Sequence, residues 1–76
     1  MTPLSEMKVT AELTHAVLQP LEDGGTIAKG VILGDIHQRW RDGTVIWTSR
    51  IMEGPDPNGL IRTRNSVYKL ADWVQA

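Results

Sequence analysis

The side chains of this sequence that are best suited to recognising another molecule are arginines interleaved with aromatic residues. Trp40 lies between two arginines, and Trp47 lies three residues before another. Small β domains use aromatic rings among guanidinium groups to stack single-stranded bases and to neutralise phosphates. The same residue types are enriched where proteins bind other proteins. The candidate binding residues are therefore Arg39, Trp40, Arg41, Arg50, Arg62, Arg64 and Tyr68.

A structural role for these residues is the open alternative. The chain has three tryptophans, one tyrosine and no phenylalanine, so its few aromatic rings must supply much of the bulk of a core. In that case both Trp40 and Trp47 belong to the core, and the arginines form a solvated face. The basic stripe of Arg62 and Arg64 also depends on the register of their strand.

The signals for catalysis or metal binding are weaker. Asp35 and His37 are two residues apart and share one face of a strand, but a metal site usually needs three or four ligands. No serine lies in a nucleophile-elbow pattern, and the chain has no cysteine. We therefore expect a protein that is not an enzyme and that uses neither a metal nor another cofactor.

Composition limits the class of protein and its location. A chain of 76 residues makes one small domain, with no disulfide to reinforce it. A formal net charge of −1 argues against a generic electrostatic binder of nucleic acid. The absence of cysteine suits a reducing compartment. The N-terminal residues lack the basic and apolar regions of a signal peptide, and no apolar run is long enough to span a membrane. We expect a cytoplasmic protein that does not bind membranes.

The segment of residues 37–51 has the pattern of a β-hairpin around which the rest of the chain packs. Asp42-Gly43 suits a type I′ turn, because Asp tolerates the positive φ that both central positions need and Gly adopts it freely. A two-residue loop places four apolar residues on one face, which we take as the core face: Ile36, Trp40, Val45 and Trp47. A three-residue loop with a bulge at Gly43 would flip one arm.

Residues 8–19 fit a helix and a strand almost equally well. As a helix, the segment gathers four apolar residues on one face: Val9, Leu13, Ala16 and Val17. As a strand, one face alternates with threonine and glutamate and consists of Val9, Ala11, Leu13, His15 and Val17. The Ala, Glu, Leu and Gln content slightly favours the helix. Pro20 ends the element in either case.

The remainder of the chain predicts short strands separated by turns. A turn at residues 23–25 precedes a strand at residues 26–36, in which Gly30 and Gly34 mark bulges or close backbone contacts. Residues 54–59 are rich in turn formers. Residues 60–70 form one bulged strand or two short strands. The expected fold for residues 1–76 is mainly β or α+β. It is a small antiparallel sheet or partly open barrel of four to five strands, with an N-terminal helix if residues 8–19 are helical.

A series of short motifs runs from Gly34 to Leu70. It is carried by Arg39, Asp42-Gly43-Thr44, Thr48-Ser49, Thr63, Ser66, Tyr68 and Leu70. This order resembles that of a class of small uncharacterised proteins found in phages, prophages and proteobacterial genomes. The resemblance covers about half of the chain. It implies a compact β fold and a phage or mobile-element origin, and it attaches no activity.

These observations together favour a non-enzymatic protein-interaction module, an accessory factor of a phage or prophage that binds a host protein. An unpaired edge strand of such a sheet can accept a strand from a partner. The alternative is a small β domain that binds single-stranded nucleic acid through its arginine and tryptophan side chains.

Overall fold

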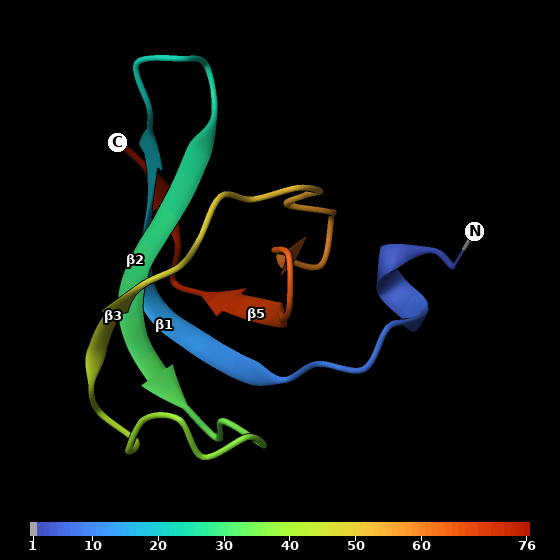
Figure 1. The fold of residues 1–76 in the computed structure, drawn as a ribbon, viewed down its shortest axis with the longest axis vertical. Helices are drawn as coiled ribbons and strands as arrows, with labels where there is room; N and C mark the ends of the chain where they lie inside the picture. The colour runs from blue at the N-terminus through green and yellow to red at the C-terminus, as the bar shows by residue number, and fades with distance from the viewer. Residues whose placement is uncertain (1) are drawn as a thin grey trace.

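The computed structural model describes residues 2–76. A 3-10 turn, η1 (Leu4–Glu6), precedes six strands: β1 (Ala11–Pro20), β2 (Thr26–Leu33), β3 (Val45–Trp47), β4 (Leu60–Arg62), β5 (Val67–Ala71) and β6 (Val74–Gln75). All six belong to one coiled, open sheet (Figure 1). The predicted small, mainly β fold is confirmed. Over the same residues, no helix has the length and apolar character needed to cross a membrane.

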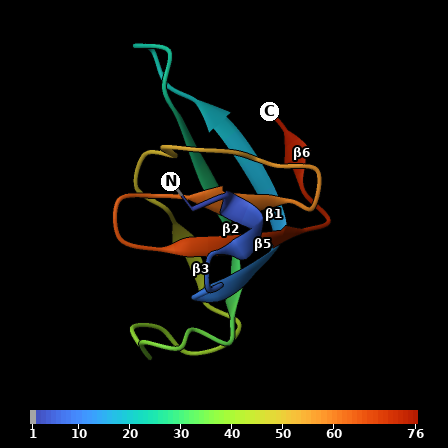
Figure 2. The same ribbon diagram turned by 90° about the vertical axis from the view of Figure 1, so that its right-hand side faces the viewer.

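Strand β1 lies at the centre of the sheet. The strand order is β3-β2-β1-β5-β4, and β6 pairs with β1 as well. β2 runs antiparallel to β1, whereas β5 and β6 run parallel to it. β5 pairs with the first half of β1 and β6 with the second half, so both lie along the same side of β1 (Figure 2). The sheet is therefore mixed, and it has more strands than the four to five expected.

The segment of residues 8–19 forms β1, so the slight preference for a helix is wrong. Its buried apolar side chains are spaced by two, three and two residues: Ala11, Leu13, Ala16 and Leu18. The step of three comes from a β-bulge between Thr14 and Val17, where His15 has a φ of 52°. A bulge inserts one residue and shifts the alternation of side chains. This irregular spacing explains why the segment resembles a helix as much as a strand.

Gly30 of β2 lies opposite the bulge, and its lack of a side chain allows the two strands to approach closely. A Cβ atom at this position would lie 2.8 Å from Cγ of Leu13 and 3.0 Å from the carbonyl oxygen of Thr14. Both distances are shorter than a favourable carbon contact of about 3.5–4.0 Å. The predicted role of Gly30 as a site of close backbone contact is therefore confirmed.

The hairpin predicted for residues 37–51 does not form. β3 pairs with β2 instead, and the loop of residues 34–44 joins these two strands. The physical reason lies in Asp35, whose carboxylate accepts hydrogen bonds from the N–H groups of His37 and Arg39. These bonds curl the chain, so the expected first arm does not extend into a strand.

Asp42-Gly43 is a turn, but not of the predicted type. The N–H of Thr44 donates to the carbonyl oxygen of Arg41 at 3.2 Å and closes the turn. Of its two central residues, Gly43 alone has a positive φ, of 91°. A type I′ turn needs a positive φ at both positions. Both predicted loops, of two residues or of three with a bulge, are therefore wrong.

The face of β3 that enters the core is the opposite of the predicted one. Ile46 is buried, whereas Val45, Trp47 and the loop residue Ile36 are exposed. Trp40 is partly buried and packs against the core. Successive side chains of a strand point to opposite faces. A register shift of one residue therefore exchanges the inward and outward side chains. Pairing with β2 directs Ile46 inward and leaves Trp47 outside.

The core is built from strands in both halves of the chain. Its largest fully buried side chains are Leu13, Ile32 and Ile61, from β1, β2 and β4. Buried residues of β3 and β5 join them in one cluster. A smaller cluster around Leu4 brings η1 against β4. Each strand from β1 to β5 therefore contributes to burial.

Residues 54–70 follow the predicted order of a turn and then strand. The turn predicted within residues 54–59 is present. β4 and β5 form a hairpin through the turn of residues 63–66, where the N–H of Thr63 donates to the carbonyl oxygen of Ser66 at 2.9 Å. Of the two alternatives for residues 60–70, two short strands are observed.

We expect Gly30→Ala to lower the free energy of unfolding by about 2 kcal/mol, because the added methyl group forces β1 and β2 apart at the bulge. Urea unfolding followed by tryptophan fluorescence measures this change. Lys69→Ala, at an exposed position of β5, is the control and should change stability by less than about 0.5 kcal/mol. Equal stability of Gly30→Ala and the wild type would show that the close approach is not required.

Candidate binding surface

The face of the sheet that points away from the core carries several rows of paired residues. We call the two rows that reach β3 the outer face. Residues that pair directly across strands lie on the same side of a sheet. The first row crosses four strands and consists of Trp47, Lys29, Val17 and Val74. The second row consists of Val45, Val31, Thr14 and Ala71. Most of these side chains are apolar, although they lie outside the core.

Three apolar residues of the outer face are more than half exposed: Val45 at 57%, Trp47 at 53% and Val74 at 59%. Val17 and Val31 are partly buried beside them. Nζ of Lys29 lies 5.1 Å from the centre of the Trp47 ring, within the range of a cation–π contact. An exposed tryptophan among aliphatic side chains is typical of a surface that binds another molecule.

Thr48 fixes the orientation of β3. Its hydroxyl accepts a hydrogen bond from the N–H of Ala28 at 2.9 Å and donates one to the carbonyl oxygen of Ser49 at 2.8 Å. Thr48 and Ile46 are both buried. Because side chains alternate along a strand, two inward neighbours direct Trp47 outward.

Asp35 organises the loop of residues 34–44. Its side chain is fully buried, and it accepts hydrogen bonds from the N–H of His37 at 3.1 Å, from the N–H of Arg39 at 2.9 Å and from Nε of Arg39 at 3.3 Å. Burial by itself raises the pKa of the Asp35 carboxyl, but the hydrogen bonds from His37 and Arg39 outweigh burial and hold this pKa below its usual value. The carboxylate is therefore ionised at neutral pH and holds the loop in place.

Arg39 connects the loop to β5. Its guanidinium carbon lies 4.6 Å from the centre of the Trp40 ring, and its Nη2 lies 3.5 Å from the hydroxyl oxygen of the buried Tyr68. We call Asp35, Arg39, Trp40 and Tyr68 the Asp35 cluster. Three of its members line a hollow of about 670 Å³ together with Gly34, Gln38, Arg41 and Asp42. Because Arg39 is paired with a buried carboxylate, the cluster anchors the loop and presents little free charge.

The other predicted arginines are spread over separate parts of the surface. Arg50 pairs with Asp23, and Nε of Arg62 lies 3.3 Å from Oε1 of Glu53. Arg64 lies in the turn after β4, so it does not form a stripe with Arg62 along one strand. Each ion pair offsets a guanidinium charge that a phosphate would otherwise meet.

Three of the seven residues proposed from the sequence come together in the Asp35 cluster: Arg39, Trp40 and Tyr68. Arg41 lines the hollow beside it, and the other three lie elsewhere, so the seven do not form one surface. Sequence reasoning missed the outer face and assigned Trp47 to the core. The alternation within Val45-Ile46-Trp47 is a signal for it, but three residues do not reveal which face is inward until the partner strand is known.

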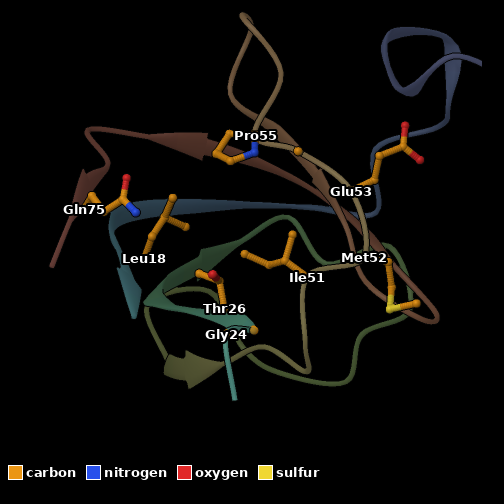
Figure 3. A pocket seen from close by; sticks show the side chains of 10 residues that line it. Leu18, Gly24, Thr26, Ile51, Met52, Glu53, Pro55 and Gln75 are labelled. Carbon is orange, nitrogen blue, oxygen red and sulfur yellow. The ribbon is translucent and has the colours of Figure 1, made fainter. Parts of the chain in front are cut away.

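A pocket of about 340 Å³ opens between the β1–β2 hairpin and the segment that follows β3 (Figure 3). Leu18, Ile51 and Pro55 supply apolar walls. Among the described residues that line it, Glu53 is the sole titratable one, and its side chain points away from the pocket toward its ion pair with Arg62. Nor do residues 2–76 bring three His, Asp or Glu side chains together as a metal ion requires. The pocket combines these apolar walls with polar backbone groups and the uncharged side chains of Thr26 and Gln75, and its described lining residues contain no acid–base pair.

We expect Asp35→Asn to lower the free energy of unfolding by about 2 kcal/mol at neutral pH, because an amide cannot accept all the hydrogen bonds that the carboxylate receives. The pKa of Asp35 is lower in the folded chain than in the unfolded chain, so the ionised form stabilises the fold above about pH 4. That contribution is lost as the pH falls through the folded-state pKa. Urea unfolding at a series of pH values should show the difference from wild type shrinking in this acidic range.

The control for this series is Asp23→Asn, which removes an exposed carboxylate that also pairs with an arginine. Its effect on the free energy of unfolding should be clearly smaller, because solvent screens an exposed ion pair. Equal effects of the two substitutions would contradict an anchoring role for Asp35.

No protein-family model, no curated protein and no solved structure matches this chain. The outer face and the Asp35 cluster are therefore the basis for a functional proposal.

Proposed function

We propose that this chain is a non-enzymatic protein-interaction module of the cytoplasm whose outer face binds a partner protein. The observation that carries the proposal is the exposure of Trp47 on a face whose two rows are mostly aliphatic. If the resemblance to phage and prophage proteins holds, the chain is an accessory factor and its partner is a host protein.

The composition of the outer face supports a protein partner. Protein interfaces are organised around a few anchors, often tryptophan, surrounded by side chains that exclude water. Trp47 has this setting, with Val45 beside it on β3 and Val17 in its own row. Lys29 is the one charged residue in the two rows. A groove that follows a nucleic-acid backbone would need several cations along its length.

Most of the arginines that suggest nucleic acid are engaged with carboxylates. Three of them form ion pairs: Arg39 with Asp35, Arg50 with Asp23 and Arg62 with Glu53. Single-stranded nucleic acid remains the alternative partner for one specific reason. Trp47 is exposed with Lys29 over its ring, an arrangement that can stack a base next to a phosphate.

The pocket of Figure 3 supports the non-enzymatic part of the proposal. Catalysis by a side chain needs a nucleophile or an acid–base group within reach of a bound substrate. Apart from Glu53, the described residues that line the pocket have no titratable side chain, and the Glu53 carboxylate points out of the pocket to Arg62.

The first test uses a photo-crosslinking amino acid, benzoylphenylalanine, placed at Val45 in the intact chain, which keeps Trp47, and exposed to a host-cell lysate. We expect a specific crosslinked protein from this position and none from Asn58, an exposed residue of a distant turn. Adding Trp47→Ala to the Val45 probe should abolish the product, because it removes the proposed anchor of the contact. The same products from both probe positions would contradict a binding role for the outer face.

The second test measures binding of short single-stranded DNA and RNA at low salt by the quenching of tryptophan fluorescence. We expect no quenching, since most of the arginines are paired and the net charge is −1. Binding through phosphates would fall by about 0.7 log units per contacted phosphate for each tenfold rise in salt. Micromolar, salt-sensitive binding that Lys29→Ala removes would replace the protein partner with nucleic acid.

A further inference from the structure

β3 leaves one edge of the sheet open. The N–H of Thr48 donates to the carbonyl oxygen of Ala28 at 2.8 Å, which fixes the phase of pairing between β2 and β3. Hydrogen-bonded positions alternate along an antiparallel pair, so the N–H and C=O groups of Ile46 also face β2. Those of Val45 and Trp47 point the other way, toward the side where β3 forms the left-hand margin of the molecule in Figure 1.

We propose that a second copy of this chain pairs with this edge, with β3 antiparallel to β3 about a two-fold axis at Ile46. In that register Val45 of one copy lies opposite Trp47 of the other. Each such pair exchanges two backbone hydrogen bonds, and the two-fold axis repeats the pair. The side chains of Val45 and Trp47 then meet on the outer face, and an aromatic residue opposite a β-branched one is a favourable cross-strand combination.

The pairing is confined to β3 itself, because the chain leaves the strand on both sides. Before β3, Asp42 lies in the turn closed by Thr44, and its Oδ1 accepts a hydrogen bond from the N–H of Gly34 at 2.8 Å. After β3, Arg50 pairs with Asp23 of the same chain. The antiparallel register therefore depends on the two pairs of Val45 with Trp47.

The other edges of the sheet are less open. Residues 52–56 cover β4, since the N–H of Met52 donates to the carbonyl oxygen of Arg62 at 2.7 Å and that of Asp56 to the carbonyl oxygen of Leu60 at 3.0 Å. β6 offers only two residues. Within residues 2–76, β3 is therefore the strand best able to accept another. Pairing through one edge closes at a dimer and does not continue into a filament.

The strength of this pairing is limited by its length. β3 has three residues, and stable protein interfaces bury roughly 1,200–2,000 Å². We therefore expect a reversible dimer that forms at high protein concentration. The dimer needs nothing besides the chain itself, and it uses Val45 and Trp47, which the proposed partner protein would also contact.

Sedimentation equilibrium of the purified chain, from micromolar to millimolar concentration, tests the dimer. The apparent molecular mass of the wild type should rise with concentration toward that of two chains. Val45→Pro removes an outward N–H and places the ring against the second copy, so association should weaken at least about tenfold. Proline is tolerated where a strand N–H faces solvent, so this variant should keep its fold. Val45→Thr keeps the N–H and the β-branched shape, and it should associate like the wild type.

A wild type that stays monomeric at millimolar concentration, or a folded Val45→Pro variant that associates like the wild type, would overturn the proposal. If circular dichroism shows that Val45→Pro does not fold, hydrogen exchange of the wild type tests the dimer instead. The amides of Val45 and Trp47 should be protected in concentrated solution and exchange freely in dilute solution. Exchange that is independent of concentration at both amides would equally contradict the dimer. These measurements use the purified chain alone, so they are separate from the crosslinking test of the outer face.

Discussion

The one-residue bulge in β1 determines which side chains reach the core and which lie on the outer face. Leu13 is buried before the bulge, and regular alternation from Leu13 would bury Val17 and expose Ala16. The insertion at His15 reverses this order, so Ala16 enters the core and Val17 joins the row of the outer face. The bulge requires Gly30 on the opposite strand, because a Cβ atom at that position would collide with β1. The composition of the candidate surface thus depends on one inserted residue and the glycine opposite it.

The Asp35 cluster fixes the position of β3. This strand has only three residues and follows a long loop, so its register depends on the order of that loop. A buried carboxylate destabilises a fold unless hydrogen bonds compensate for its lost hydration. Asp35 receives that compensation from the loop itself, so the loop is ordered by the same bonds that make burial possible. The loop is also tied to the start of β1, where the N–H of Ile36 donates to the carbonyl oxygen of Thr10 at 2.9 Å. β3 therefore reaches β2 from an anchored segment.

The parts of the fold that the sequence predicts are those with local signals. β-branched residues indicate β2, and the Gly, Pro, Asp and Asn content of residues 54–59 indicates the turn there. For residues 60–70, the two short strands that form are one of the two predicted alternatives. The hairpin predicted for residues 37–51 does not form, although Asp42-Gly43 is a local turn signal. The hydrogen bonds that Asp35 accepts from His37 and Arg39 curl the segment that would have been its first arm. The parallel pairing of β5 and β6 with β1 joins segments far apart in the chain and leaves no local pattern. The outer face is hidden for the same reason, since its rows exist only after distant strands are paired.

Trp47 is hard to explain by folding alone. The inward contacts of β3 are made by Ile46 and Thr48, so a polar residue at position 47 would leave the core unchanged. An exposed tryptophan on an open edge strand also carries a risk of aggregation. The chain limits that risk by keeping β3 short and by placing Lys29 over the indole ring. A side chain that the core does not need, held in a fixed orientation and partly shielded by a cation, is the feature from which we propose contact with a molecule outside the chain.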